Sequence, residues 1–397
     1  MRRVYLDHNA TTPMRPEVRE HLLQQIEALG GNPSSVHRSG RSARAVLDAA
    51  RERTAAALRV HEDEIVFTSG GTESINLAIL GVAGSAAQEP GHAEGNARGG
   101  HRGLLTSAAE HSAVLGAAGE LASRGRRVVL ASVDSACRVD PDEILRRASD
   151  SASFALVSIM AANNEVGTLQ PLAEIGERLA RLGTSRPLLH TDAVQALGRV
   201  RLDVAEARAD LASFSAHKLG GPLGVGLLFK RRGVVLHGIM FGGGQEDGLR
   251  PGSENVPAIS AASVALELAL REREEFEART RDLSQLLWGE ISRTLPDVEL
   301  LGPPLDAPDR LPNTLDLSIG GVDGRTLVAR LDLEGLEASA GSACASGSLE
   351  PSHVLIAMGL TPERARAGLR ISLGRTTSRD DVQSAVEILR SSVSALR

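Results

Sequence analysis

Lys218 carries the strongest chemical signal in the sequence, because it follows a predicted buried strand and precedes two glycines, Gly220 and Gly221. A lysine partly withdrawn from water has a lowered pKa, so its amine can form a Schiff base with a carbonyl compound. An isolated lysine of this kind is more often an exposed loop residue whose stem lies along the surface. The surrounding motifs shift the balance toward chemistry.

Asp192 stands at the end of another predicted strand, in the segment His190–Gln195. A carboxylate there can pair with the protonated ring nitrogen of pyridoxal phosphate (PLP), which keeps the ring able to take up electrons from a breaking bond at the substrate Cα. Gln195 follows one turn later and can donate to a ring oxygen. The simpler interpretation of Asp192 is a helix N-cap, which is common at a strand-to-helix junction. The spacing alone is compatible with a PLP enzyme.

Two further segments follow predicted strands. Thr68–Ser74 contains paired glycines before a helix, where converging backbone N–H groups favour a phosphate. It lacks the Gly-Lys-Ser/Thr ending of a P-loop, and an ordinary capping box formed by Thr72 and Glu73 is an equally good interpretation. His111 follows the next strand, where a histidine can stack on a flat cofactor and move protons, or can simply be a partly buried, hydrogen-bonded residue.

Cys344 lies in a run of small residues, Ser339–Leu349, which predicts an exposed and mobile loop. An exposed thiol is a chemical liability, so its position indicates use, although burial as an inert residue is the commoner fate of cysteine and the one we expect for Cys137. Arg370 stands at the edge of a predicted strand. It can grip a substrate carboxylate with two parallel hydrogen bonds or form an ordinary surface ion pair.

Seven short apolar runs that alternate with helical patterns must position these residues. Such alternation predicts a mostly parallel sheet with helices on both faces. Helices are predicted at residues 18–29, 42–58, 72–80 and 172–182. The predicted strands are residues 65–67, 104–106, 128–130, 154–160, 188–191, 211–214 and 225–229.

A second part of the chain begins with one long predicted helix, residues 258–291, with a charged middle. A helix longer than ~25 residues is unusual inside one domain, so we expect it to join two. Strands near Leu315 and Ile371 and helices near Leu327, His353 and Val382 then predict a smaller α+β domain, completed by the N-terminal residues. We expect a large domain over residues 15–258 and a small domain over residues 1–14 and 259–397 that carries the Cys344 loop.

Composition excludes several classes of protein. Apolar residues make up 42% and charged residues 24% of the 397 positions, which is typical of a soluble globular protein. A net charge of −6 gives no general attraction to nucleic acid or anionic membrane. The two cysteines form no CxxC pair and no disulfide framework, so we expect a reducing, cytoplasmic setting. No secretory signal, membrane span or metal site is expected, and the Gly84–Gly103 patch predicts a flexible surface insertion.

Seven motifs occur in the order seen in a known family. They are Tyr5–Pro13, Gly31–Ser35, Gly70–Ser74, Asn163–Gly167, His217–Lys218, Gly242–Glu246 and Gly341–Ser352. The sequence resembles the cysteine desulfurases of the nitrogen-fixation and iron–sulfur-assembly type, class-V aminotransferases of PLP fold type I, from about Tyr5 to Arg375. The resemblance implies an α/β, aspartate-aminotransferase-like fold: a large domain with a mainly parallel seven-stranded sheet plus a smaller α+β domain. It also implies a homodimer with its active sites at the subunit interface.

The same resemblance implies roles for individual residues. Lys218 would hold PLP covalently, Asp192 would pair with the ring nitrogen, and His111 would stack on the ring. Arg370, with Asn164 nearby, would bind the substrate carboxylate, and Cys344 would be the nucleophile. The remaining contacts would be Gln195 and Asn164 to the ring oxygen, and Gly71, Thr72, Ser215, His217 and Ser253 of the partner subunit to the phosphate.

The implied reaction converts L-cysteine to L-alanine and leaves the sulfur as a persulfide on Cys344. Lys218 would move the Cα proton. The sulfur would pass to an acceptor such as an iron–sulfur scaffold, a tRNA-thiolation enzyme or a DNA-sulfur modification system, without membrane or direct nucleic-acid binding.

Four departures from the family pattern bear on these expectations. Ser253 stands where threonine is usual, which keeps the hydroxyl, and Ala161–Ala162 stand where a histidine is common. The Gly84–Gly103 insertion is long for the family. The chain ends at Arg397 without the tail by which housekeeping members dock their scaffold, which puts that partnership in doubt.

Three alternatives stay open at this point. Selenocysteine lyase shares the fold, the cofactor and most motifs. Another PLP enzyme, such as an aminotransferase, would not need Cys344. A non-catalytic member would only bind a partner and would carry no PLP.

Overall fold

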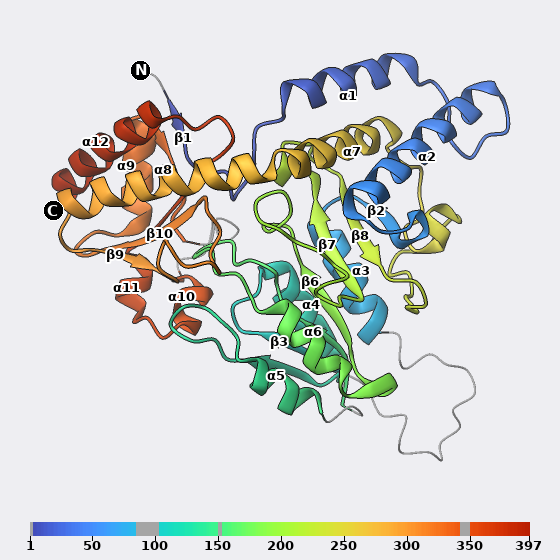
Figure 1. Cartoon of the computed structure of the whole chain (residues 1–397), viewed down its shortest axis with the longest axis horizontal. Coiled ribbons are helices and arrows are strands. Elements are labelled where there is room, and N and C mark those ends of the chain that lie inside the picture. Colours follow the sequence, from blue (N-terminus) through green and yellow to red (C-terminus); the bar gives the residue numbers. More distant parts are fainter. Residues whose placement is uncertain (1–2, 85–102, 150–152, 342–349) are drawn as a thin grey trace.

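A seven-stranded sheet buried between helices forms the larger part of the computed structural model, which describes residues 3–84, 103–149, 153–341 and 350–397 (Figure 1). The strand order is β2-β8-β7-β6-β5-β3-β4, and only β8 runs against its neighbours. The predicted α/β fold with a mainly parallel sheet is therefore confirmed. The strands are β2 (Ile65–Thr68), β3 (Gly103–Ser107), β4 (Val128–Ala131), β5 (Phe154–Ser158), β6 (Leu188–Asp192), β7 (Leu211–Ser215) and β8 (Gly226–Lys230).

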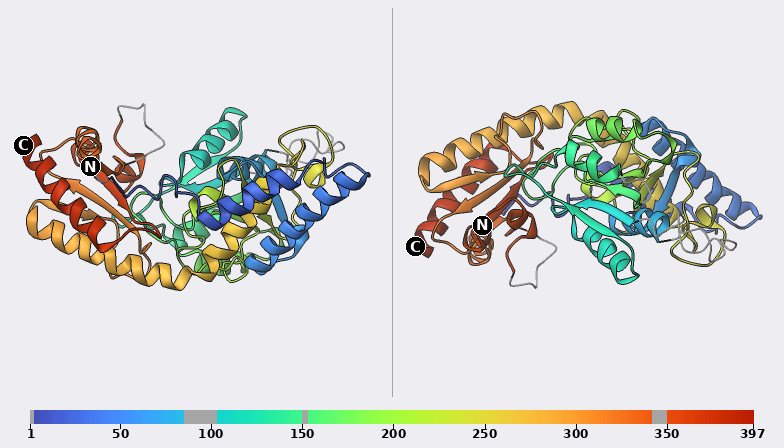
Figure 2. Two further views of the ribbon diagram at one scale, coloured as in Figure 1. Left: turned by 90° about the horizontal axis from the view of Figure 1, so that it is seen from above. Right: turned by 90° about the horizontal axis from the view of Figure 1, so that it is seen from below.

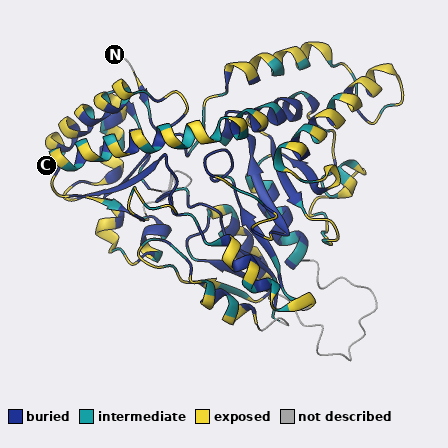
Figure 3. Ribbon diagram, in the orientation of Figure 1, coloured by how far each residue is buried: buried dark blue, intermediate teal, exposed yellow. Residues whose placement is uncertain are grey.

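Helices cover both faces of this sheet, because side chains that alternate along each strand enter two different hydrophobic cores. Leu105 and Val157 belong to the core shared with α2, α5, α6 and α7, whereas their neighbours Leu104 and Leu156 belong to the core shared with α3 and α4. Figure 3 shows the strands as the most buried elements of the molecule. The helices are α1 (Pro16–Ala28), which packs on α7, and α2 (Arg38–Leu58), α3 (Gly71–Ala83), α4 (Ser112–Ser123), α5 (Pro141–Ala148), α6 (Leu172–Ala180) and α7 (Val256–Arg271).

The C-terminal part has its own core around an antiparallel sheet of order β12-β10-β9. The N-terminal strand β1 (Val4–Tyr5) joins this part, because it pairs in parallel with β11 (Leu336–Glu337). Figure 2 shows both termini at this end of the molecule. The exact domain boundaries stay a prediction. The other elements are β9 (Val298–Leu301), β10 (Thr314–Ile319), β12 (Gly368–Ser372), α8 (Arg273–Thr294), α9 (Gly324–Leu333), α10 (His353–Ala357), α11 (Pro362–Arg366) and α12 (Arg379–Leu396).

The prediction of one long helix is wrong at a single residue. Glu272 separates α7 from α8 with φ −92° and ψ 4°, outside the usual helical values. Its carboxylate lies 2.7 Å from Nη1 of Arg15, a buried side chain in the segment before α1. The ion pair holds the break against the N-terminal segment, and α8 then continues into the C-terminal part (Figure 1).

Two features are absent from the part of the chain that the structure describes. None of their helices combines the length and apolar character needed to cross a membrane. Nor do their histidine, cysteine, aspartate and glutamate side chains gather in a group of three or more that could hold a metal ion.

Candidate active site

A cavity of about 320 Å³ opens at the carboxyl ends of the parallel strands, where ligands bind in open α/β sheets. We call it the sheet-end cavity. Of the predicted site residues that the structure describes, all except Ser253 line it. The lining residues are Asn9, Ala10, Gly71, Thr72, Ile75, His111, Met160, Ala162, Asn164, Asp192, Val194, Gln195, Ser215, His217, Lys218 and Arg370.

Lys218 enters this cavity from the short 3₁₀ turn Ala216–Leu219, directly after β7. Gly220 ends the turn with φ +78°, a left-handed conformation that glycine adopts without strain. The Lys218 Nζ donates to two backbone carbonyls, that of Asn9 at 2.5 Å and that of Ala10 at 2.7 Å. The amine is thus held between the end of β7 and the N-terminal segment that precedes α1.

Asp192 is a buried carboxyl group at the end of β6. Its Oδ1 accepts from the backbone N–H of Val194 at 3.0 Å, a local turn in place of the helix cap that was the alternative interpretation. Burial raises the pKa of Asp192, while the neighbouring charges of His111 and Lys218 lower it. A cationic partner inside the cavity would favour the ionised carboxylate.

His111 is the N-cap of α4, and its Nδ1 accepts from the backbone N–H of Ala113 at 3.1 Å. In the neutral imidazole the proton therefore resides on Nε2. This hydrogen bond fixes the imidazole ring shortly after the end of β3, where it lines the sheet-end cavity.

The start of α3 offers an anion site in the same cavity. Backbone N–H groups in a first helical turn have no partner within the helix, and the helix dipole favours negative charge there. A Cβ on Gly71 would lie 2.9 Å from Cγ2 of Val194, so a side chain would crowd this space. His217 stands opposite with its Nδ1 3.0 Å from Thr11 Oγ1, and burial, aided by Lys218 and Arg199, lowers the pKa of His217 to about 4.

Arg370, in β12, brings a cation from the C-terminal part to the cavity. Its Nη2 donates to Asp7 Oδ1 at 2.9 Å and its Nη1 to the Asn164 carbonyl at 3.2 Å. The backbone of Arg370 also pairs with that of Ser339 in both directions. The guanidinium is therefore fixed in place before any substrate carboxylate arrives.

Four further features of the sequence analysis are not among the described lining residues of the sheet-end cavity. Ser253 is exposed and does not line the sheet-end cavity of its own chain. Cys344 lies outside the described residues, as does most of the Gly84–Gly103 patch, residues 85–102. Cys137 is buried, as expected, and burial raises the pKa of its thiol well above the ordinary value.

Glu110 is a site neighbour whose burial was not predicted from the sequence. Its Oε1 accepts from the Met160 backbone N–H at 3.0 Å and from Ser107 Oγ at 2.8 Å, whereas Oε2 has no partner. Burial raises the pKa of Glu110 to about 8, and the nearby Asp192 adds to this. Glu110 is thus a neutral acid at pH 7, immediately before His111.

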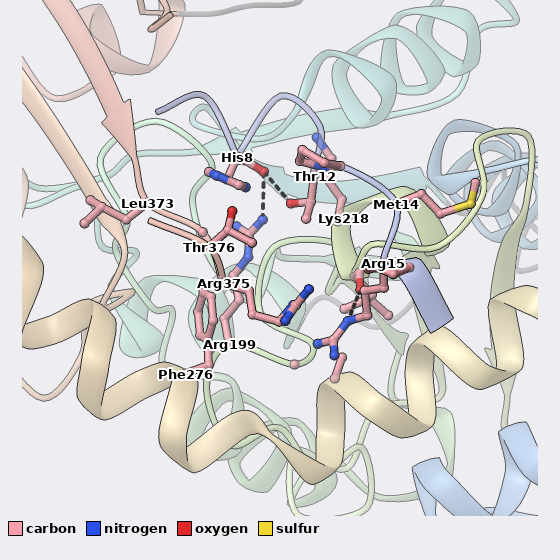
Figure 4. A pocket seen from close by; sticks show the side chains of 16 residues that line it. His8, Thr12, Met14, Arg15, Arg199, Lys218, Phe276, Leu373, Arg375 and Thr376 are labelled. Carbon is pink, nitrogen blue, oxygen red and sulfur yellow. Dashed lines mark hydrogen bonds between the residues drawn. The ribbon is translucent and has the colours of Figure 1, made fainter. Parts of the chain in front are cut away.

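A second cavity of about 220 Å³ lies on the other side of Lys218, and we call it the arginine cavity (Figure 4). Arg15, Arg199 and Arg375 line it, and its described lining includes no aspartate or glutamate. Burial lowers the pKa of Arg199 to about 9. Its Nη2 donates to the His8 carbonyl at 3.1 Å, and its Nη1 donates to Asn9 Oδ1 at 2.7 Å and to Oε1 of Gln195.

The sheet-end cavity fits PLP on three observations. A buried carboxyl, Asp192, is placed to meet a cationic ring nitrogen. Gly71 keeps space open beside the first turn of α3, where a phosphate can sit. Lys218 reaches the same space and can bind the cofactor aldehyde.

Comparisons with known proteins agree with this geometry. The Aminotransferase class-V family matches residues 4–384. A cysteine desulfurase IscS from Dictyoglomus turgidum is 41% identical over 397 residues, covering 100% of this chain and 96% of the relative. The solved structure of a NifS-like protein gives a TM-score of 0.89 at 35% identity and covers 99% of this chain and 100% of its own. A structure of SspA in complex with cysteine gives 0.76 at 30% identity, with 93% and 98% covered.

Proposed function

The chain belongs to the class-V aminotransferase family, whose cofactor is PLP, and from this we propose that it is a cysteine desulfurase that forms L-alanine and a protein persulfide. Similarity to relatives of that name extends over the full chain. The observation that carries the proposal is the sheet-end cavity, into which Lys218, Asp192 and Arg370 project from three separate strands or their ends.

PLP, when bound, supplies an electron sink for the bond that breaks at the substrate Cα. The chain would hold it through Lys218 at the aldehyde, Asp192 at the ring nitrogen and the start of α3 at the phosphate. His111 would lie against the ring and direct Nε2–H into the cavity, because Nδ1 is occupied by Ala113. The remaining cofactor contacts would be Asn164, Gln195, Ser215, His217 and Ser253 of the partner subunit.

Substrate orientation would come from Arg370. Its guanidinium is buried and already held by Asp7 and Asn164, so binding a carboxylate requires little further ordering of the side chain. A carboxylate bound there would anchor the substrate in the cavity that Lys218 also lines. Lys218, released when substrate binds, would take the Cα proton.

The thiolate of Cys344 would then attack the substrate sulfur. The new S–S bond forms as the Cβ–S bond breaks, so L-cysteine and one thiol become L-alanine and one persulfide, with no external oxidant or reductant. The described residues on either side of this segment support delivery to the cavity, because Ser339 pairs with Arg370 and the Ser352 Oγ donates to Glu165 at 2.5 Å.

A homodimer is the second part of the proposal. Ser253 faces solvent rather than its own sheet-end cavity, as expected if it serves the cavity of the partner subunit. Large apolar side chains are also exposed. Leu23 and Ile26 lie on α1, and Leu223 and Phe241 lie within about thirty residues of Ser253 in the sequence; Phe241 is 92% exposed. A second copy would cover them, and light scattering coupled to gel filtration would give twice the chain mass.

The acceptor of the sulfur belongs to the same proposal. We favour an iron–sulfur scaffold protein or a tRNA-thiolation enzyme in the cytoplasm, since the chemistry ends with a transferable persulfide sulfur on Cys344. Labelled persulfide on the purified protein should pass to such an acceptor on mixing.

Anaerobic incubation with L-cysteine, followed by peptide mass spectrometry and an alanine assay, tests the reaction. We expect one added sulfur on Cys344 and alanine in the product. The Cys344→Ser variant should bind PLP and cysteine but gain no sulfur. Persulfide on that variant would refute the assignment of the nucleophile, and PLP-loaded protein that yields neither alanine nor persulfide would refute the desulfurase.

A further inference from the structure

We propose that Asn9 is a positioning residue for Lys218. Its side chain fixes two backbone carbonyls, those of Asn9 and Ala10, at which the lysine amine docks whenever it is not bound covalently. We call these two groups the carbonyl pair. The inference rests on the proposed function, in which each substrate molecule releases Lys218 from the cofactor.

The carbonyl pair is the observed partner of the Lys218 amine. The Nζ atom lies 2.5 Å from the Asn9 oxygen and 2.7 Å from the Ala10 oxygen. An ammonium group has three donors, and hydrogen bonds from a charged donor are the short and strong ones. Two backbone oxygens in adjacent residues therefore form a fitted receptor for the protonated lysine.

Asn9 is almost completely buried, and each of its backbone and side-chain polar groups forms a hydrogen bond. The backbone carbonyl oxygen of Asn9 accepts from Gln195 Nε2 at 2.9 Å as well as from Lys218, so it binds two site residues at once. The Asn9 backbone N–H donates to Ser372 Oγ at 2.9 Å, and Nδ2 donates to the Asn164 carbonyl at 3.1 Å and to Thr314 Oγ1 at 2.9 Å. The Oδ1 atom accepts from Arg199 Nη1 at 2.7 Å and from Asn313 Nδ2 at 3.4 Å.

These contacts fix the carbonyl pair from two sides. Thr314 in β10 and Ser372 in β12 belong to the C-terminal part, whereas Arg199 follows β6 of the large sheet. Arg199 reaches Asn9 from the wall of the arginine cavity, where Figure 4 shows its guanidinium beneath the His8 carbonyl. Both Nδ2 protons are used, so rotation of the side chain would leave buried polar atoms without partners, at a cost in free energy.

The released lysine needs such a receptor during turnover. A neutral amine that takes the Cα proton becomes an ammonium, inside a site that already holds the buried cations Arg370 and Arg199. The carbonyl pair accepts two of the three N–H bonds and keeps Nζ at a fixed position. The amine thus keeps its orientation until it binds the cofactor again.

Acetylation of Lys218 in the full-length protein after removal of PLP tests this directly. Only the neutral amine reacts with acetic anhydride, so a displaced carbonyl pair should raise the rate at pH 8. We expect Asn9→Ala to raise it by about three- to tenfold, the equivalent of one lost charge-assisted hydrogen bond. Peptide mass spectrometry with a competing labelled peptide measures the rate.

Gln170→Ala is the matched control, because Gln170 is also a buried side-chain amide. It accepts from the Val139 backbone N–H at 3.0 Å and donates to the Cys137 carbonyl at 2.6 Å, and the described hydrogen bonds link it to neither Asn9 nor Lys218. This variant should destabilise the fold but leave Lys218 acetylation unchanged. Thr314→Val removes one acceptor from Asn9 Nδ2 and should have a smaller effect of the same sign. If Asn9→Ala does not fold, Thr314→Val decides the question.

Equal Lys218 acetylation rates in wild type, Thr314→Val and any foldable Asn9 variant would overturn the inference. The measurement involves neither PLP nor cysteine, so it can fail while the desulfurase proposal stands. In the PLP-loaded enzyme, Asn9→Ala should lower kcat with little change in KM, and α-deuterated cysteine should show a larger isotope effect than in wild type. A general loss of structure would also change KM, and the Gln170→Ala control would then show an altered acetylation rate too.

Discussion

The two cavities on either side of Lys218 differ in charge. The sheet-end cavity combines the cations Lys218 and Arg370 with the buried carboxyl of Asp192, whereas the described lining of the arginine cavity is cationic and without acidic residues. The carboxyl of Asp192 forms no ion pair among the described residues, so it can pair with a charged ligand. The guanidinium of Arg199, in contrast, already donates hydrogen bonds to His8, Asn9 and Gln195. The difference indicates that the sheet-end cavity binds the reacting groups, whereas the arginine cavity holds the N-terminal segment beside Lys218 in position.

Lys218→Ala should have the largest effect, because Lys218 lines both cavities. We expect loss of covalently bound PLP and a fall in turnover of about 10³-fold or more. The visible spectrum and alanine formation report both. A variant that kept measurable turnover would remove the distinction between a reactive and a supporting cavity.

Asp192→Asn perturbs the sheet-end cavity alone. The amide cannot carry the charge that stabilises a cationic ring nitrogen, so we expect turnover to fall by about 10²- to 10³-fold. The KM for cysteine should change little, because Arg370 is untouched. Wild-type rates in this variant would show that the buried carboxyl is only a structural turn.

Glu110→Gln tests the buried acid behind His111 through stability. The pKa of Glu110 is raised to about 8 from an ordinary value near 4.3, so the folded state binds the extra proton and wild-type stability falls as the pH rises between these values. Glutamine cannot ionise, so the variant should lack this decline. Its melting temperature relative to wild type should rise by several degrees from pH 5 to pH 9, and parallel curves would contradict the assignment.

Arg375→Ala should have the smallest effect. The side chain is exposed at the arginine cavity and contacts neither Asn9 nor Gln195 in the described hydrogen bonds. We expect turnover and stability to change by less than about twofold and ~0.5 kcal/mol. A tenfold loss of turnover would mean that the arginine cavity takes part in the reaction.

The sequence predicted the large sheet and the sheet-end cavity well, because Lys218, Asp192 and His111 each follow a strand directly and strand ends of a parallel sheet meet at one edge. It did not predict the burial of Glu110, which depends on Met160, about fifty residues later in the chain. Nor did it predict the contacts of Asn9, because hydrogen-bond partners 305 and 363 residues away leave no local pattern. The helix break at Glu272 was not predicted for the same reason, since its ion-pair partner Arg15 is remote in sequence.

The pairing of Asn9 with Ser372 also sets an order of events during synthesis. At ~5–20 residues per second, the ribosome makes Ser372 roughly 20 to 70 s after Asn9. The large sheet, whose last strand ends at Lys230, is complete well before then. A nascent chain at that stage therefore contains every strand of the large sheet but neither Arg370 nor Ser372, a hydrogen-bond partner of the N-terminal segment. The sheet-end cavity thus receives Arg370, one of its lining residues, only when translation is almost finished.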